Sequence, residues 1–141
     1  MAEAETATKT LQVTIVTPDG TAFDSQRVDM AVLATTDGEV GIMANRLPLV
    51  AALKIDQARF HIGDDTEVYA VNGGFAEFSD NLLTIVAPSA EDSRDIDVHR
   101  AEAARLRAEK RAQAAQTADD RKRAEVALAR AINRINTSKL K

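Results

Sequence analysis

Apolar and polar residues alternate with a period of two through the first part of the chain, and turn signals separate the alternating stretches. Leu11, Val13 and Ile15 occupy every second position, a spacing typical of a half-buried strand. Asn72-Gly73-Gly74 is a strong hairpin signal. Further short strands are expected at residues 28–32, 40–43, 58–62, 68–71, 75–78 and 82–86. Strands at this spacing, with no helical pattern between them, predict an all-β sandwich or barrel.

After Pro88 the pattern changes to a helical period. Apolar residues, mostly alanine, recur at spacings of three and four over residues 101–115 and again over residues 124–135. Ser93 or Asp95 is expected to cap a first helix that begins near Ile96, with Asp97 in its first turn. Thr117 opens a segment similar to a capping box, which starts the second helix. Because only a few residues separate the two helices, they are predicted to form an antiparallel hairpin.

These patterns predict an α+β fold, in which an N-terminal antiparallel β-sandwich is followed by a C-terminal antiparallel two-helix hairpin. We expect a flexible N-terminal extension over residues 1–10, the sandwich over residues 11–90 and the hairpin over residues 91–141. All six glycines and all three prolines lie at or before Pro88. The charge divides near the same place, since residues 91–141 carry a balance of +4 and the preceding residues −8. An acidic β domain is therefore followed by a basic helical region.

The seam expected between the two helices consists almost entirely of alanine. Alanine lets two helices approach closely, but it buries little surface, because each buried methylene contributes roughly 0.8 kcal/mol. The helices themselves are favoured by their content of Ala, Arg, Glu and Lys. Two interpretations stay open: a permanently folded hairpin, or two stable helices whose packing is weak enough for the hairpin to open.

Four arginines of the predicted hairpin have spacings that gather them toward one end of it, namely Arg100, Arg107, Arg130 and Arg134. If the chain turns near residue 117, Arg100 lies level with Arg134. The four charges repel one another, and nearby Asp97 and Glu91 offset only part of the repulsion. A phosphate-bearing ligand would relieve it through bidentate contacts with the guanidinium groups. The alternative is that all four side chains point into solvent.

Signals for other chemistry are sparse. The chain has no cysteine, and its two histidines, His61 and His99, have no second ligand at metal-binding spacing. It has neither a nucleophile elbow nor a Walker A loop, so an enzyme in its own right is not supported. No apolar run approaches the ~20 residues that cross a bilayer, so we expect no direct membrane insertion. A net acidic chain with few aromatic residues is a poor nucleic-acid binder.

Several segments, in the same order, resemble the epsilon subunit of bacterial F-type ATP synthases. The resemblance runs from about Leu11 to Asn136 and lies in four motifs. They are DGEVGI at 37–42 with PLV at 48–50, GGFAE at 73–77, NLLTIVA at 81–87, and IDVHRA at 96–101. The last is similar to the I/L-D-x-x-R-A motif of that family. Each motif alone is weak, but the ordered set is specific.

The resemblance implies a β-sandwich that grips the gamma subunit and rests on the c-ring of the membrane rotor. The chain would then be a non-catalytic, peripheral component at the cytoplasmic side of a bacterial cell membrane. The resemblance also implies a two-helix region that either folds against the sandwich or extends toward the alpha and beta subunits, where it blocks ATP hydrolysis. No cofactor is required, but in several bacterial members ATP binds the folded hairpin and holds it in place.

The family's ATP contacts carry over to this sequence residue by residue. The motif itself supplies Ile96, Asp97, Arg100 and Ala101, and the other contacts fall on Glu91, Arg107, Arg130 and Arg134. The partner contacts are Glu39 and Arg46, which match the region facing the rotor ring, and the basic cluster Arg121, Lys122 and Arg123, which would meet an acidic surface of the beta subunits.

Two positions depart from the family pattern. The family usually has His where Arg46 stands, and often Gly where Asp56 stands. The second departure predicts a different turn after Leu53. A rival hypothesis from another class is a soluble adaptor whose basic helical region binds an acidic protein. Co-purification separates the two hypotheses, because an epsilon subunit is recovered with alpha, beta and gamma chains.

Overall fold

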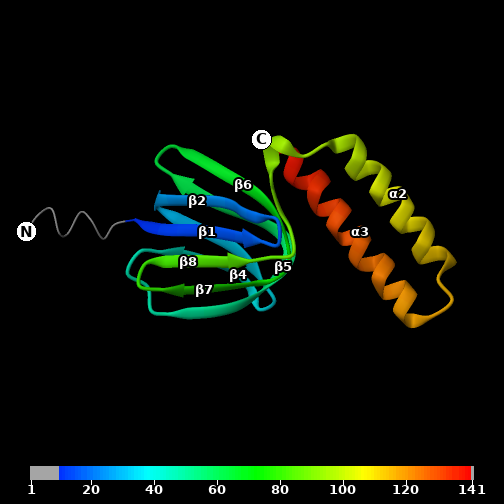
Figure 1. Ribbon diagram of the computed structural model, residues 1–141, viewed down its shortest axis with the longest axis horizontal. Coiled ribbons are helices and arrows are strands. Elements are labelled where there is room, and N and C mark those ends of the chain that lie inside the picture. The colour runs from blue at the N-terminus through cyan, green and yellow to red at the C-terminus, as the bar shows by residue number, and fades with distance from the viewer. Residues whose placement is uncertain (1–9, 141) are drawn as a thin grey trace, which may run out of the picture.

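The structure is a computed structural model that describes residues 10–140 of the chain. Within these residues, nine strands are followed by a short 3-10 helix and two α-helices. We refer to strands β1–β9 as the body and to helices α2 and α3 as the arm. Figure 1 shows the arm packed beside one end of the body, with the N-terminal end of β1 pointing away from it. The expected extension at residues 1–10 falls almost wholly outside the described residues.

The strands and helices have the following bounds. The strands are β1 (Leu11–Thr17), β2 (Gly20–Val28), β3 (Met30–Thr35), β4 (Gly38–Met43), β5 (Leu49–Ile62), β6 (Asp65–Asn72), β7 (Phe75–Ser79), β8 (Leu82–Val86) and β9 (Ala90–Asp92). The helices are η1 (Ser93–Asp95), α2 (Val98–Ala114) and α3 (Ala118–Ser138).

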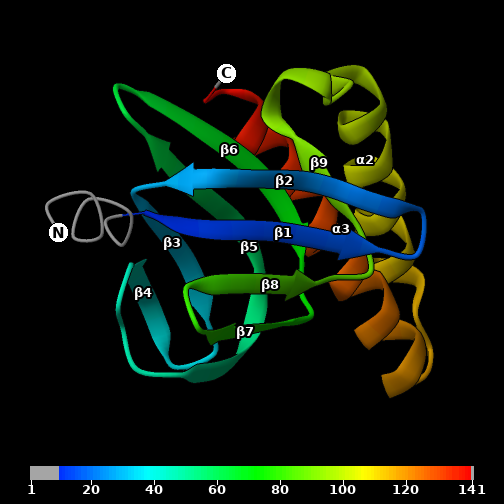
Figure 2. The ribbon, with the colours of Figure 1, turned by 60° about the vertical axis from the view of Figure 1, so that its left-hand side comes forward.

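The body is a sandwich of two sheets that share strand β5. One sheet has the order β2-β1-β8-β7-β5, and the other has β4 and β3 on one side of β5 with β6 and β9 on the other. Leu49–Ala52 of β5 pairs with β7, whereas residues from Ile55 to Ile62 pair with β6. Strand β5 therefore passes from one sheet to the other, as Figure 2 shows. The predicted turn after Leu53 is wrong, because the strand continues through that position.

The predicted fold class is confirmed, with one difference in strand direction. Strands β1 and β8 run parallel, with Val13 opposite Leu83 and Ile15 opposite Ile85, whereas the other described pairs are antiparallel. The alternation in β1 is the expected one, since Leu11, Val13 and Ile15 are all fully buried. The sheet is thus mixed, and its parallel pair joins two strands far apart in the sequence.

Large apolar side chains from both sheets fill the core of the body. Phe60 and Phe78 are at most 1% exposed, and Phe23 stacks on Phe60 with ring centroids 4.8 Å apart. Stacked aromatic pairs of this kind contribute beyond the area they bury. This core closes without help from the arm.

Asn72-Gly73-Gly74 is not the turn of a hairpin, because β6 and β7 do not pair with each other. The segment carries the chain from one sheet to the other. Gly74 has φ of +97°, and a Cβ at this position would lie 2.0 Å from the Val86 carbonyl oxygen. Glycine is therefore required at this position, because the backbone of another strand lies too close for a side chain. The sequence Asn-Gly-Gly looks the same whether its glycines form a hairpin turn or allow such a close approach.

The two helices form the expected antiparallel hairpin, but the first begins later than expected. Asp97 is its N-cap, and its carboxylate accepts a hydrogen bond from the backbone N–H of Arg100, so the expected cap at Ser93 or Asp95 is wrong. Those two residues belong to η1 instead. Thr117 caps α3 as expected, with its hydroxyl accepting from the N–H of Asp120. Ala101, Ala108, Ala124 and Ala131 are buried, which confirms the alanine seam.

Candidate functional site

A groove of about 410 Å³ lies where α3 meets the body. Its volume is within the range of small-molecule sites. Polar side chains come from both parts of the molecule, and alanines form the apolar remainder. The lining residues are Asn72, Ser89, Ala90 and Glu91 from the body, Ala104 from α2, and Ala127, Arg130, Ala131 and Arg134 from α3. The groove therefore exists only while the arm is folded against the body.

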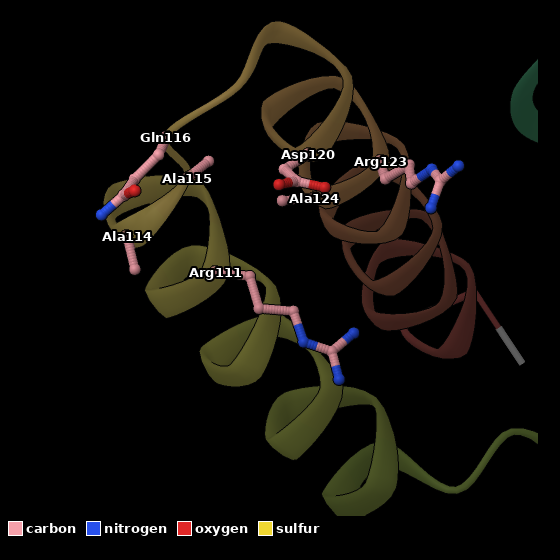
Figure 3. A pocket seen from close by; sticks show the side chains of 7 residues that line it. All are labelled: Arg111, Ala114, Ala115, Gln116, Asp120, Arg123 and Ala124. Atoms are coloured by element: carbon pink, nitrogen blue, oxygen red, sulfur yellow. The ribbon is translucent and has the colours of Figure 1, made fainter.

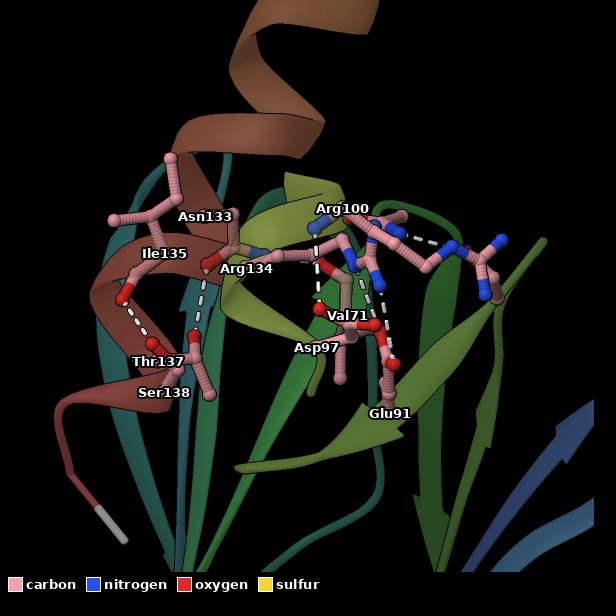
Figure 4. Close-up of polar contacts among 11 residues, drawn as sticks. Val71, Glu91, Asp97, Arg100, Asn133, Arg134, Ile135, Thr137 and Ser138 are labelled. Atoms are coloured by element: carbon pink, nitrogen blue, oxygen red, sulfur yellow. Dashed lines mark hydrogen bonds and ion pairs between the residues drawn. The ribbon is translucent and has the colours of Figure 1, made fainter. Parts of the chain in front are cut away.

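Arg134 and Glu91 form a bidentate ion pair across this groove. The Nε and Nη2 atoms of Arg134 donate to the two carboxylate oxygens of Glu91 over 2.8 and 3.2 Å, and Figure 4 shows the pair. The two side chains retain 22% and 34% of their exposure, so the pair is partly shielded from water. Fork-to-fork geometry of this kind is both directional and stronger than a single charged contact. It ties α3 to β9.

The motif at residues 96–101 shapes the start of α2 rather than the floor of the groove. Ile96 and Ala101 are buried, at 4% and 0% exposure, and Asp97 caps the helix over a 3.1 Å hydrogen bond to the Arg100 N–H. Arg100 is exposed. In Figure 4, Asp97 and Arg100 lie beside the Glu91–Arg134 pair. This arrangement brings the motif next to the groove without making it part of the lining.

The eight residues predicted for ATP contacts thus divide into three groups. Glu91, Arg130 and Arg134 line the groove together, while the four motif residues lie next to it. Arg107 is exposed and does not line the groove. Seven residues of α-helix span about 10 Å, so Arg107 lies well beyond Arg100 along α2 toward the far end of the arm. Two of the four arginines therefore line the groove, and Glu91 neutralises Arg134 directly.

Asn72 and Ser89 were not predicted, although they supply the body side of the groove. The Asn72 amide donates to the Ser89 hydroxyl over 2.6 Å. Among the described residues, the Oδ1 atom of Asn72 is the buried side-chain oxygen left without a hydrogen-bond partner. Buried polar atoms are nearly always paired. An unpaired acceptor in the wall of a groove is therefore a candidate contact for a ligand that carries a donor.

A second charged cluster fixes the segment that leads from the body into the arm. Arg94 donates to Asp92 over 2.6 Å and also contacts Glu67. Hydrogen bonding to Arg94 lowers the pKa of Asp92 below its ordinary value of 3.8. Burial, together with the charges of Asp92 and Glu67, raises the pKa of the neighbouring Tyr69 to about 12. The lowered pKa keeps Asp92 charged and the raised pKa keeps Tyr69 neutral at pH 7, and the Arg94 contacts hold η1 against β6.

The predicted partner residues lie on exposed surfaces. Glu39 forms an ion pair with Arg59 over 3.3 Å near the start of β4. Arg46 lies past the other end of that strand, where its Nη1 donates to the Leu47 carbonyl. The basic cluster Arg121, Lys122 and Arg123 is exposed in the first turns of α3.

A larger hollow, of about 510 Å³, lies at the far turn of the hairpin. Figure 3 shows its lining, in which Arg111 and three residues at the end of α2 lie across from Asp120 and Ala124 of α3, while the Arg123 side chain points outward. None of the eight predicted ATP contacts lines it. We regard the smaller groove as the candidate site, because it combines paired charges, an unpaired buried acceptor and residues from both parts of the molecule.

Neither α2 nor α3, the long helices of residues 10–140, has the length and apolar character needed to cross a membrane.

Comparison with known protein families covers nearly all of the chain. Residues 10–93 match the family described as the beta-sandwich domain of the ATP synthase delta/epsilon chain. Residues 94–139 match the long alpha-helix domain of the same chain. The chain therefore belongs to the delta/epsilon chain family of ATP synthases.

Curated relatives narrow this to the epsilon chains of bacteria. The chain is 52% identical to the ATP synthase epsilon chain of Pediococcus pentosaceus, over 92% of this chain and 95% of the relative. It is 53% identical to that of Levilactobacillus brevis, over 92% and 94% of the two chains. The corresponding chain of Bacillus cytotoxicus is 46% identical, over 94% and 99%. The predicted family, the epsilon subunit of F-type ATP synthases, is confirmed.

Solved structures support the fold. A chain in the mitochondrial ATP synthase of Euglena gracilis, in an assembly described as OSCP, F1 and c-ring, superposes with a TM-score of 0.79. That match has 21% identity and covers 94% of this chain and 82% of the other. A central-stalk and c-ring structure from Tetrahymena thermophila gives a TM-score of 0.65 at 12% identity, covering 90% and 95% of the two chains.

Proposed function

We propose that this epsilon subunit is a non-catalytic part of the central stalk that connects the gamma subunit to the c-ring, and that its arm regulates ATP hydrolysis. Support comes from the family, from relatives at about half identity over nearly full length, and from the assemblies in which chains of similar fold are found. Association with the cytoplasmic side of a bacterial membrane would then be peripheral and would depend on these partners.

The body offers two surfaces that suit these partners. On the outer face of the β1–β8–β7 sheet, Val16 lies opposite Val86, and Val86 lies opposite Phe75, so apolar side chains form a row. Val16 is 38% and Phe75 is 47% exposed. Contiguous exposed apolar surface of this kind indicates a protein contact, and we assign it to gamma. At the end of β4, the exposed Leu47 beside Arg46 is the proposed contact for the ring.

The arm is proposed to inhibit hydrolysis when it extends toward the alpha and beta subunits. Two features support an arm that can detach. The seam between α2 and α3 buries mainly alanine methyl groups. The contact between the arm and strands β5 and β6 is made mostly by α3 rather than α2. In the extended state, the exposed cluster Arg121, Lys122 and Arg123 is proposed to meet acidic residues of the beta subunits.

We further propose that ATP binds the groove between arm and body and favours the folded arm. The observation that carries this is the joining of Glu91 and Arg134, from the two parts of the molecule, beside Arg130 in one groove. Because a carboxylate repels phosphate, Arg130 and Arg134 are assigned to the phosphates. Glu91 and the unpaired Asn72 Oδ1 are acceptors, which suits the hydroxyl and amine groups of the nucleoside. A ligand that binds only the folded state shifts the equilibrium by its differential affinity.

Calorimetry of the isolated chain with ATP tests the proposal. Arg130→Ala and Arg134→Ala are each expected to weaken binding by about tenfold or more, since a charged hydrogen-bond partner typically contributes ~1.5–3 kcal/mol. Arg111→Ala is the matched control, because Arg111 lines the distant hollow instead, and it should bind ATP like the parent. Unaltered affinity in both test variants, or no binding by the parent at millimolar ATP, would remove ATP sensing from the proposal.

A further inference from the structure

The C-terminal turns of α3 bury polar side chains where they meet the body. Asn133 is 6%, Thr137 is 0% and Ser138 is 4% exposed. Polar groups are buried without penalty only when their hydrogen bonds are made. The hydrogen bonds that these three side chains make therefore decide what each contributes where α3 meets the body.

Asn133 makes the contacts that join this part of α3 to the body. Its Nδ2 donates to the Asp56 carbonyl over 3.2 Å and to the Val71 carbonyl over 3.3 Å. Asp56 and Val71 are opposite each other in the β5–β6 pair, so one amide group bridges two neighbouring strands. Figure 4 shows Asn133 aimed at the strands beneath α3.

Thr137 completes the arrangement from one helical turn further on. Its hydroxyl donates to the Oδ1 atom of Asn133 over 3.3 Å. This bond orients the amide, because it occupies the oxygen and leaves both N–H groups for the carbonyls of the body. Ser138 does not take part, since its hydroxyl donates to the Ile135 carbonyl within the helix.

We propose that Asn133 is a positioning residue that locks the folded arm to the body without any nucleotide. The proposal rests on the regulatory arm proposed above, and it adds a second determinant of the folded state. Arg134, the next residue, reaches Glu91 from the same turn of α3. By fixing this turn over β5 and β6, Asn133 also holds Arg134 at the groove, although Asn133 is not among the groove's lining residues.

A lock made of hydrogen bonds suits a contact that opens and closes. When the arm leaves, water can take up the hydrogen bonds of Asn133 and of both carbonyls. A lock made of large apolar side chains would instead leave a patch with a tendency to associate. The polar contact thus gives the folded arm a fixed position, and its hydrogen-bonding groups do not form an apolar patch when the arm is released.

The test measures arm position in the isolated chain without nucleotide. Because the natural sequence has no cysteine, cysteines placed at the exposed positions Asp64 and Gln116 can carry a pair of distance probes between body and arm. Asn133→Ala removes both hydrogen bonds from the arm to these body carbonyls, and we expect the ratio of extended to folded arm to rise about five- to 100-fold. Hydrogen exchange of α3 amides should accelerate by a similar factor if the extended fraction is too small to observe directly.

Two further variants make the result specific. Asn136→Ala removes the same side chain from an exposed position of the same helix, so it should leave the distance distribution unchanged. Thr137→Val keeps the shape but loses the hydroxyl, and it should open the arm by a smaller factor than Asn133→Ala. If Asn133→Ala disrupted the body, seen as faster exchange in β1 and β8, the outcome for Thr137→Val would decide.

The result is independent of ATP binding. If Asn133→Ala opens the arm while the parent ignores ATP, the lock stands and nucleotide sensing fails. If ATP closes the arm of the parent but Asn133→Ala behaves like Asn136→Ala, the lock is wrong and nucleotide sensing stands.

Discussion

The core of the body is built from large apolar side chains, whereas the seam of the arm is built from alanine. Phe60, Phe78 and Leu83 are almost fully buried in the body. In the arm the buried positions between the helices hold Ala101, Ala108 and other alanines, and each of them buries one methyl group. A residue such as Phe contributes about 1.5–3 kcal/mol on burial, and alanine far less. The comparison indicates a body that stays folded and an arm whose position can change.

The contact between the two regions differs from both of them. It consists of the Glu91–Arg134 ion pair and the hydrogen bonds of Asn133, with Ile135 as a buried apolar residue at 8% exposure. Directional polar contacts specify one docked position but contribute modest net stability, typically ~0.5–1.5 kcal/mol for each hydrogen bond. The molecule therefore combines a stable core, a weak seam and a precise junction.

The largest effect is expected in the core of the body. Phe60→Ala should lower the free energy of unfolding by about 3–5 kcal/mol, because it removes a fully buried ring and leaves a cavity. In the arm, Ala108→Gly should cost only about 1 kcal/mol, through helix propensity. Urea unfolding followed by circular dichroism measures both. Phe75→Ala, at a position 47% exposed, serves as the control and should have a small effect; equal losses from Phe60 and Ala108 variants would contradict the comparison.

The boundary between the two regions can be located by truncation. A chain ending at Asp95 keeps β9 and the Asp92–Arg94 contact, whereas one ending at Pro88 loses the edge strand that pairs with β6. We expect the shorter chain to be less stable by roughly 1–3 kcal/mol, since it leaves backbone groups of β6 without partners. Both should still bind gamma. Equal urea midpoints for the two chains would show that β9 adds nothing to the body.

A functional comparison concerns the exposed charges at the start of α3. Replacing Arg121, Lys122 and Arg123 together by Ala should weaken inhibition of the reassembled ATPase roughly threefold or more, because each exposed charge pair contributes ~0.2–1 kcal/mol. High salt should act in the same direction by screening. Helix content should be unchanged by circular dichroism. Inhibition that responds to neither change would mean that these residues face solvent in the extended state.

The smallest effect is expected for ion pairs within one helix. Arg105 contacts Glu102 and Glu109 over 3.0 Å in each case. These pairs are partly exposed, so Arg105→Ala should lower stability by only about 0.3–0.5 kcal/mol. Thermal unfolding measures the change. A loss as large as that of Phe60→Ala would show that the arm contributes to the cooperative unit of the body.

Local patterns in the sequence predicted elements whose character is local. The strict alternation in β1 and the alanine period in α2 can each be recognised from residues that are close together in the sequence. Thr117 is correctly predicted as a cap for the same reason. The first part of β5, at residues 49–57, and β2 up to residue 27 were missed, because they do not alternate cleanly. Asn72-Gly73-Gly74 was misassigned to a hairpin, since a turn signal does not say which sheet the chain enters next.

The candidate site shows the same division. Helical spacing singled out Arg130 and Arg134, which lie one turn apart on α3 and both line the groove. It could not show that Arg107 is absent from the lining of the groove, because that depends on how the arm packs against the body. Asn72, Ser89 and Asn133 were missed for a related reason: their partners are distant in sequence, and an isolated Asn or Ser carries no spacing signal.

The parallel pairing of β1 with β8 has a consequence for the order of events during synthesis. Gln12 of β1 lies opposite Leu82 of β8, about 70 residues later. Pairs so far apart in sequence are slow to form, and this one cannot form before β8 has left the ribosome. Helices α2 and α3 emerge from the ribosome afterwards and need only local contacts to become helical. The surface of β5 and β6 that contacts α3 can thus be complete when the last turn of α3 is released. A newly made chain can therefore fold its arm against the body as soon as synthesis ends.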